Sequence, residues 1–168
     1  DVTMAMVHFY ATNAADEAAC LAGLEAEPSD DTACADGGLV RLLTGDGEVL
    51  ELEPDDAYPA LVALDGAPAR AFGGQSNGYI TSYFDLQGLN RDDLRLELLF
   101  LSNSVGIDHG WFIQSIVLYD GDVIPPNLTV GETLPDTADV EGPYRLTVRA
   151  SDNRGMERVT LNYAEEGG

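Results

Sequence analysis

Hydrophobic and polar residues alternate along much of this chain with the two-residue period of β-strands. The even-numbered residues of 79–86 share one face of a predicted strand. The even-numbered residues of 94–101 are all Leu or Phe, and we expect them to point inward. The outward positions of this second strand end with Leu99 and Leu101, which predicts that this end is covered on both faces.

The stretch "WFIQSIVLY", residues 111–119, is apolar on both faces apart from Gln114 and Ser115. A strand that is apolar on both faces is typical of the middle of a protein with a layer on each side. We therefore expect residues 111–119 to form a central strand between two layers.

Other segments follow different patterns. Residues 15–27 are rich in Ala and Glu and give the one plausible helix. Residues 39–43 and 48–53 flank "TGDG", whose Asp-Gly predicts a hairpin turn. Residues 54–69 carry three prolines, and we expect a long ordered excursion there rather than a helix.

The pattern changes near Asp122, where prolines and turn residues mark a domain boundary. Beyond it, two alternating segments, 144–151 and 158–163, are joined by "DNRG" and predict a hairpin. Their inward positions would be Tyr144, Leu146, Val148, Ala150, Val159, Leu161 and Tyr163. Two or three strands bury too little to stand alone, so this second domain is predicted to be incomplete or to lean on a partner.

The predicted fold class is therefore all-β. A jelly-roll sandwich is expected over residues 1–122. A smaller, partial immunoglobulin-like sandwich is expected over residues 123–168.

The net charge of the chain is −22, because 30 acidic residues face only eight basic ones, all of them Arg. Binding of nucleic acid or of anionic lipid depends on Lys and Arg, so neither partner is expected. Cations, and calcium in particular, suit such a surface. The alternative is that the charge serves solubility alone.

Two cysteines, Cys20 and Cys34, lie on either side of an acidic loop. A zinc site would need more Cys or His ligands nearby, and a catalytic thiolate would need basic neighbours. We therefore predict a local disulfide and an oxidising compartment, outside the cell or at its surface. No apolar run is long enough for a membrane span. The sequence shows no leader segment, so we expect a mature chain or one excised from a longer protein.

Calcium would require several carboxylates gathered by loops. The acidic loop that contains Asp36 is one source, and Asp108 and Asp120, at the two ends of the 111–119 strand, are another. Asp36, Asp108 and Asp120 are therefore the candidate metal ligands. The alternative is a set of solvated acidic loops.

Two further groups are candidates for ligand binding. Asp108 and His109 lie in a loop beside Trp111, whereas His8 lies inside a strand and is expected to pack there. Aromatic residues of a possible carbohydrate-binding face are Tyr58, Tyr79, Tyr83, Trp111 and Phe112, although Trp111 could instead anchor the core. No motif of a nucleophile with its base is present, so we expect no enzyme activity.

The motifs "ADGGLVRLL", "SNGYITSYFDLQGLN" and "GWFIQSIVLYD" appear in this order over residues 35–120. With them the chain, from about Val7 to Asp120, resembles the MAM-like, concanavalin-A-like jelly roll that accompanies secreted bacterial peptidases of the immune-inhibitor-A type. Residues 133–163 are similar to the immunoglobulin-like repeats of the same proteins. Gln114 and Ser115 stand where that family carries two acids, so any contribution of those acids to a calcium site is absent here.

The resemblance implies a non-catalytic, extracellular module of bacterial origin that serves adhesion, binding or assembly in a larger protein. Its partner would be a protein or a carbohydrate at the cell surface, or another copy of itself. Two alternatives stay open. One is a structural subunit of an extracellular filament or coat, completed by strand donation. The other is an accessory domain of a secreted metallopeptidase.

Overall fold

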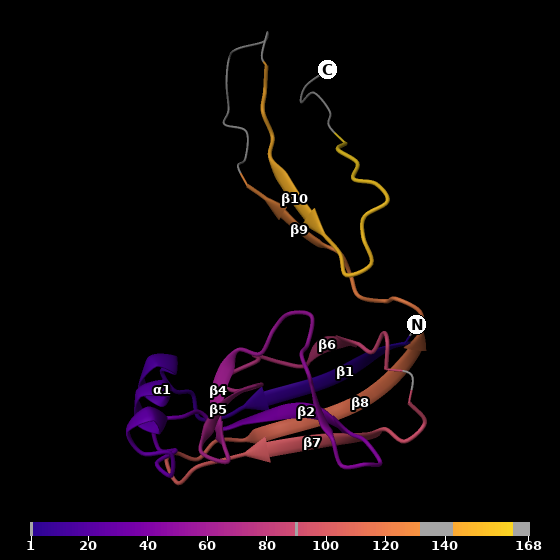
Figure 1. Cartoon of the computed structure of the whole chain (residues 1–168). Coiled ribbons are helices and arrows are strands. Elements are labelled where there is room, and N and C mark those ends of the chain that lie inside the picture. Colours follow the sequence, from indigo (N-terminus) through magenta and orange to yellow (C-terminus); the bar gives the residue numbers. More distant parts are fainter. Residues whose placement is uncertain (1, 90, 132–142, 163–168) are drawn as a thin grey trace. The chain divides into compact units, whose positions relative to one another are not determined.

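The computed structural model describes residues 2–89, 91–131 and 143–162 of the chain. It divides into two compact units, Asp1–Asp122 and Val123–Gly168, which are treated separately below. Both are built from antiparallel strands, with one short helix in the first (Figure 1), so the predicted all-β class is confirmed.

The first unit contains two three-stranded sheets. The β1 sheet has the order β6 (Ile80–Asp85), β1 (Val2–Ala11) and β8 (Gly110–Asp120). The β2 sheet has the order β3 (Val49–Leu52), β2 (Gly37–Leu43) and β7 (Arg95–Leu101). The hairpin predicted around "TGDG" is confirmed, since β2 and β3 pair antiparallel with Leu43 opposite Val49.

The hydrophobic core lies between these two sheets. Met4, Met6 and Tyr10 of β1 meet Val40 and Leu42 of β2 and Phe84 of β6 in one buried cluster. The sheets approach closely at one end, because Gly38 lies directly against the Trp111 ring. A Cβ atom at Gly38 would fall 2.0 Å from Trp111 Cε3.

Residues 54–69, which were expected to form a long ordered excursion rather than a helix, contain no helix, but they do contain a strand that the sequence pattern did not indicate. The segment contains β4 (Ala60–Leu64), which pairs antiparallel with β5 (Ala67–Ala71). The turn between them has Asp65 at φ 50° and Gly66 at φ 80°, as a tight two-residue hairpin turn requires. In β5 every second residue is Ala and residue 68 is Pro, and both residue types are depleted in strands, so the strand pattern is weak.

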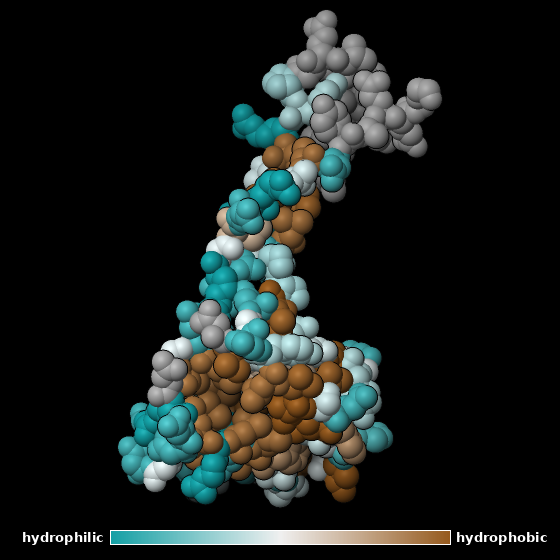
Figure 2. Space-filling model, turned by 90° about the vertical axis from the view of Figure 1, so that its right-hand side faces the viewer, coloured by the Kyte–Doolittle hydropathy of each residue, from teal (hydrophilic) through white to brown (hydrophobic). Residues whose placement is uncertain are grey.

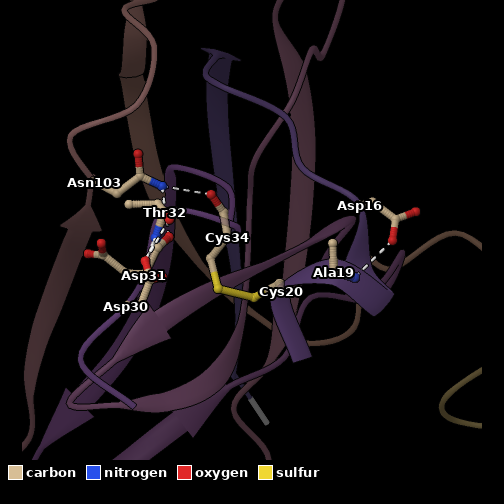
Figure 3. Close-up of a disulfide and its surroundings, with 8 residues drawn as sticks. All are labelled: Asp16, Ala19, Cys20, Asp30, Asp31, Thr32, Cys34 and Asn103. Atoms are coloured by element: carbon tan, nitrogen blue, oxygen red, sulfur yellow. Dashed lines mark hydrogen bonds between the residues drawn. A yellow bond between two sulfur atoms is a disulfide. The ribbon is translucent and has the colours of Figure 1, made fainter. Parts of the chain in front are cut away.

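The predicted helix is confirmed as α1, Glu17–Ala26. Asp16 caps its start, accepting a hydrogen bond from the Ala19 amide at 2.9 Å. The predicted disulfide is also present (Figure 3): it joins Cys20 of α1 to Cys34, with 4.4 Å between their Cα atoms. In the described part of the chain no helix is long and apolar enough to cross a membrane.

The prediction that residues 111–119 form a central strand is wrong for the part of the chain that the structure describes. There, β8 pairs with β1 alone and forms the edge of its sheet. Its second apolar face is not covered by a layer, and Val117 and Tyr119 on that face are exposed. A bulge at Gln114 interrupts the pairing, since Val7 lies opposite Ser115 and His8 opposite Ile113.

In the second unit, the predicted hairpin around "DNRG" is not found among the described residues. Instead β10 (Val148–Ser151) pairs antiparallel with β9 (Asn127–Val130). Residues 156–162 form no strand, and Tyr163 lies outside the described residues. The jelly-roll and immunoglobulin-like assignments of the two units stay predictions.

Candidate functional site

The inward side of β7 is only partly covered by the described residues, although the strand belongs to the sandwich. Phe100, Leu98 and Leu96 lie opposite Gly38, Val40 and Leu42 of β2, and they therefore point to the same side. Val40 and Leu42 are 0% and 6% exposed. The three β7 side chains are 42%, 39% and 40% exposed. The predicted direction of these residues is right, but their burial is incomplete.

The inward side of β8 shows the same feature. Leu118 lies opposite Met4 of β1, and Ile116 lies opposite Met6. Met4 and Met6 are fully buried, whereas Leu118 is 64% exposed. Between β7 and β8 lies an incompletely covered apolar region, which we call the side opening; it is formed by Leu96, Leu98, Phe100, Ile116 and Leu118.

An apolar hollow of about 460 Å³ lies at one end of the side opening. Figure 2 shows a broad hydrophobic area on the viewed side of the first unit. The hollow is lined by the ends of β1, β2, β7 and β8 and by the loop after β6: Val2, Met4, Leu42, Leu86, Gln87, Gly88, Leu89, Leu94, Leu96, Ile116 and Leu118. Gln87 is the one polar side chain among them. Pockets for small polar ligands hold several converging polar groups, so this lining favours an apolar partner.

A second, acidic hollow of about 230 Å³ lies at the other end of β7, where Phe100 forms part of its wall. Asp36 and Asp108 both line it. Asp36 is buried, and its carboxylate accepts a hydrogen bond from the backbone N–H of Asn103 at 2.8 Å. The structure thus brings together two of the predicted acidic site residues from segments more than 70 positions apart.

Asp108 and His109 interact with each other, as the sequence suggested. One oxygen of Asp108 accepts from the His109 backbone N–H at 2.7 Å and contacts its ring Nδ1 at 2.8 Å. The other oxygen accepts from the Gln75 amide at 2.9 Å. The hydrogen bond from the His109 side chain, followed by that from its backbone, lowers the pKa of Asp108. Asp108 is therefore a fixed negative charge at the rim of the acidic hollow.

Asn103 connects several segments at this end of the unit and was not among the site residues expected from the sequence. Its side-chain amide donates to the carbonyl of Cys34 at 2.7 Å and to that of Asp31 at 3.1 Å (Figure 3). Its backbone N–H donates to the Asp36 carboxylate. Asn103 therefore ties the loop after β7 to the disulfide-bonded loop. A lone Asn in a loop carries no signal of such distant partners.

The three predicted metal ligands do not form one cluster. Asp120 lies opposite Val2, at the far end of β8 from Asp108, and an extended strand of this length spans roughly 33 Å. No group of three His, Cys, Asp or Glu side chains suitable for a metal ion occurs within the described residues. Calcium binding stays a prediction. Thermal melting with calcium and with a chelator tests it, and equal melting temperatures would contradict it.

Trp111 points into the core rather than into the 104–109 loop. Its indole Nε1 donates to His8 Nδ1 at 2.9 Å. The neutral His8 ring therefore carries its proton on Nε2, which donates to Ser82 Oγ at 3.0 Å. Burial lowers the pKa of His8 to about 4. His8 and Ser82 form a pair within hydrogen-bond distance, yet both are buried, so no substrate reaches them.

The predicted aromatic set is divided between two places. Tyr58 and Trp111 pack in or against the core. Tyr79 and Phe112 lie on the outer side of the β1 sheet, where each ring centroid is 5.9 Å from that of Phe9. Carbohydrate binding by the remaining outer residues stays a prediction.

No known protein family, curated protein or solved structure matches this chain. The resemblance to the MAM-like jelly roll therefore stays a prediction, and the side opening is interpreted from its own chemistry.

Proposed function

We propose that this chain is a non-catalytic, extracellular module that docks another polypeptide in the side opening. It would serve adhesion or assembly within a larger secreted or cell-surface protein. The observation that carries the proposal is the exposure of Leu96, Leu98, Phe100 and Leu118, which point inward from their strands. Large apolar surfaces of this kind mark interaction sites in stable proteins.

Two further observations support the proposal. The Cys20–Cys34 disulfide fits an oxidising compartment. The apolar hollow lacks the converging polar groups that would orient a small substrate. An apolar stretch of polypeptide needs no such groups, because its binding free energy comes from surface removed from water.

The test is selection from a phage-displayed library of random peptides of about 12 residues, since peptide segments dock on exposed strands and grooves of this size. Selected peptides should bind the wild-type chain and lose about tenfold or more in affinity for Leu98→Glu and Leu118→Glu, because each variant buries a charge in the contact. Val49→Glu is the matched control. Val49 is also an exposed apolar strand residue, at 44%, but lies on β3 at the opposite edge of the β2 sheet.

Circular dichroism and thermal melting of each variant establish that it is folded. Failure to select any peptide, or equal binding by Leu98→Glu, Leu118→Glu and Val49→Glu, would refute docking in the side opening.

A further inference from the structure

Among the described residues the outer edge of β8 is unpaired, and residues 111–119 carry no charge or proline there, although the bulge at Gln114 is a feature that also discourages strand pairing. Edge strands of soluble proteins are usually interrupted by charges or proline, because their unpaired N–H and C=O groups attract other strands. Residues 111–119 contain neither, and the bulge at Gln114 is the one irregularity in the pairing of β8 with β1. The edge strand β7, in contrast, carries Arg95 and Glu97, and β3 carries Glu51.

A strand added to the free edge of β8 would lie above the partly covered inward side of β7. Neighbouring strands are about 4.8 Å apart, and packed sheets are about 10 Å apart. Every second side chain of the added strand would then point down onto Leu96, Leu98 and Phe100. Leu118 would gain a neighbour within its own sheet. One added strand thus covers the exposed inward residues of both β7 and β8.

The charge of the first unit specifies the chemistry of the added strand. Most acidic residues of the chain lie in residues 1–122, where four Arg offset them: Arg41, Arg70, Arg91 and Arg95. The acidic hollow with Asp36 and Asp108 opens beside Phe100, at one end of the side opening. A basic side chain fits there, whereas a second copy of the same unit would bring like charge.

We propose that the side opening takes up an extended segment of another polypeptide, which adds to β8 as a further strand of the β1 sheet. This segment carries large apolar residues at alternate positions, facing Leu96, Leu98 and Phe100. An Arg or Lys at one end lies beside Asp108. The inference rests on the proposed function and specifies its partner.

The probe is the peptide RLTVRLTVR, which repeats the apolar and basic alternation of residues 145–149 and spans roughly 30 Å when extended. Its binding to the full chain is measured by fluorescence anisotropy. Hydrogen exchange of the amides in residues 111–119 is followed in the same samples. Binding with exchange slowed by about tenfold or more in β8 is expected, because an added strand pairs with N–H groups that were open to water. No binding, or binding without slowed exchange in β8, would overturn the inference.

Two N-methylated versions of the peptide test main-chain pairing. One is methylated at its Leu and Val amides and the other at Thr and the internal Arg, so each blocks one edge of the strand. One version should lose about tenfold in affinity and the other should bind like the unmodified peptide, since only one edge pairs with β8. If both methylated peptides keep the affinity of the unmodified peptide, or if both lose it, addition to β8 is overturned.

The charge requirement is tested with Asp108→Asn, for which Asp65→Asn in the distant β4–β5 turn is the control. The Asp108 variant should bind RLTVRLTVR with about threefold lower affinity, because one charge at the rim of the acidic hollow is removed. Unchanged affinity would overturn the placement of the basic residue. Light scattering of the free chain tests whether a second copy of the chain occupies the edge instead. A dimer in which the β8 amides already exchange slowly would assign the edge to that second copy and overturn the inference.

The two proposals fail in different ways. If the random library yields peptides that Leu98→Glu no longer binds, while RLTVRLTVR leaves β8 exchange unchanged, docking stands and strand addition is wrong. If the library yields none and RLTVRLTVR does not bind, both are wrong.

Discussion

Mild acid should destabilise the first unit through His8. The unfolded chain takes up a proton on this ring near the ordinary pKa of 6.5, whereas burial holds the folded pKa at about 4. Between these two values the unfolded state binds more protons, so stability is complete above pH 6.5 and falls as the pH is lowered towards 4. Each pH unit in this window lowers the free energy of unfolding by about 1.4 kcal/mol. The loss reaches about 2 kcal/mol at pH 5 and about 3 kcal/mol near pH 4.

The assay is urea unfolding at several pH values between 5 and 7.5, followed by the fluorescence of Trp111. The many carboxylates of this chain also titrate in acid, so wild type is compared with His8→Gln, which keeps a polar amide but no titratable ring. His109→Gln is the matched control, because it removes the exposed and only other histidine. Wild type and His109→Gln should lose about 2 kcal/mol more than His8→Gln between pH 6.5 and 5. Parallel pH profiles for wild type and His8→Gln would show that protonation of His8 does not destabilise the folded unit.

Three other predictions concern the interior of the first unit, and urea unfolding measures each. Replacing Cys20 and Cys34 by Ser should lower the free energy of unfolding by about 3 kcal/mol, because the unfolded chain regains the conformational entropy that a closed loop of this size removes. An unchanged free energy of unfolding would show that the disulfide does not constrain the unfolded chain. Gly38→Ala should cost about 1–3 kcal/mol and shift the Trp111 emission, because its Cβ has no room beside the indole; an unchanged spectrum would contradict this close approach. Tyr58→Phe should cost about 1–3 kcal/mol, because the Tyr58 hydroxyl links the Val40 amide to the Leu52 carbonyl inside the core, and a neutral result would contradict that role.

The strands with clear alternation could be predicted because the two-residue period is a local property. Ser82 and Phe84 are buried on one face of β6, as the pattern requires. The β4–β5 hairpin was missed because its alternation runs through Ala and Pro. In this hairpin the turn geometry at Asp65 and Gly66 decides the structure, more than the strand propensity of its residues.

The position of β8 shows what alternation leaves open. An apolar strand face that packs in a core and one that is left open for a partner show the same pattern of apolar residues in the sequence. Leu118 and Ile116 therefore supported a central strand, although Leu118 is largely exposed at an edge. Strand order follows from pairings between distant segments, which a local pattern does not contain.

The candidate site could be predicted only in part for the same reason. Asp108 and Asp36 were recognised as acidic site residues from their type and loop position. Their meeting in one hollow depends on the loop after β7, where Asn103 bonds to Asp36 and to the carbonyl of Cys34. These contacts join positions about 70 residues apart, and no spacing rule links them.

Hydrogen exchange along β8 in the free chain measures whether this edge is open to a partner strand. In a strand paired on one side only, successive N–H groups point alternately towards β1 and towards solvent. We expect alternating slow and fast exchange through residues 115–120, and again through 110–113 beyond the bulge. Uniformly slow exchange along β8 would contradict it, because the edge would then already be covered and the side opening would not be available to a partner.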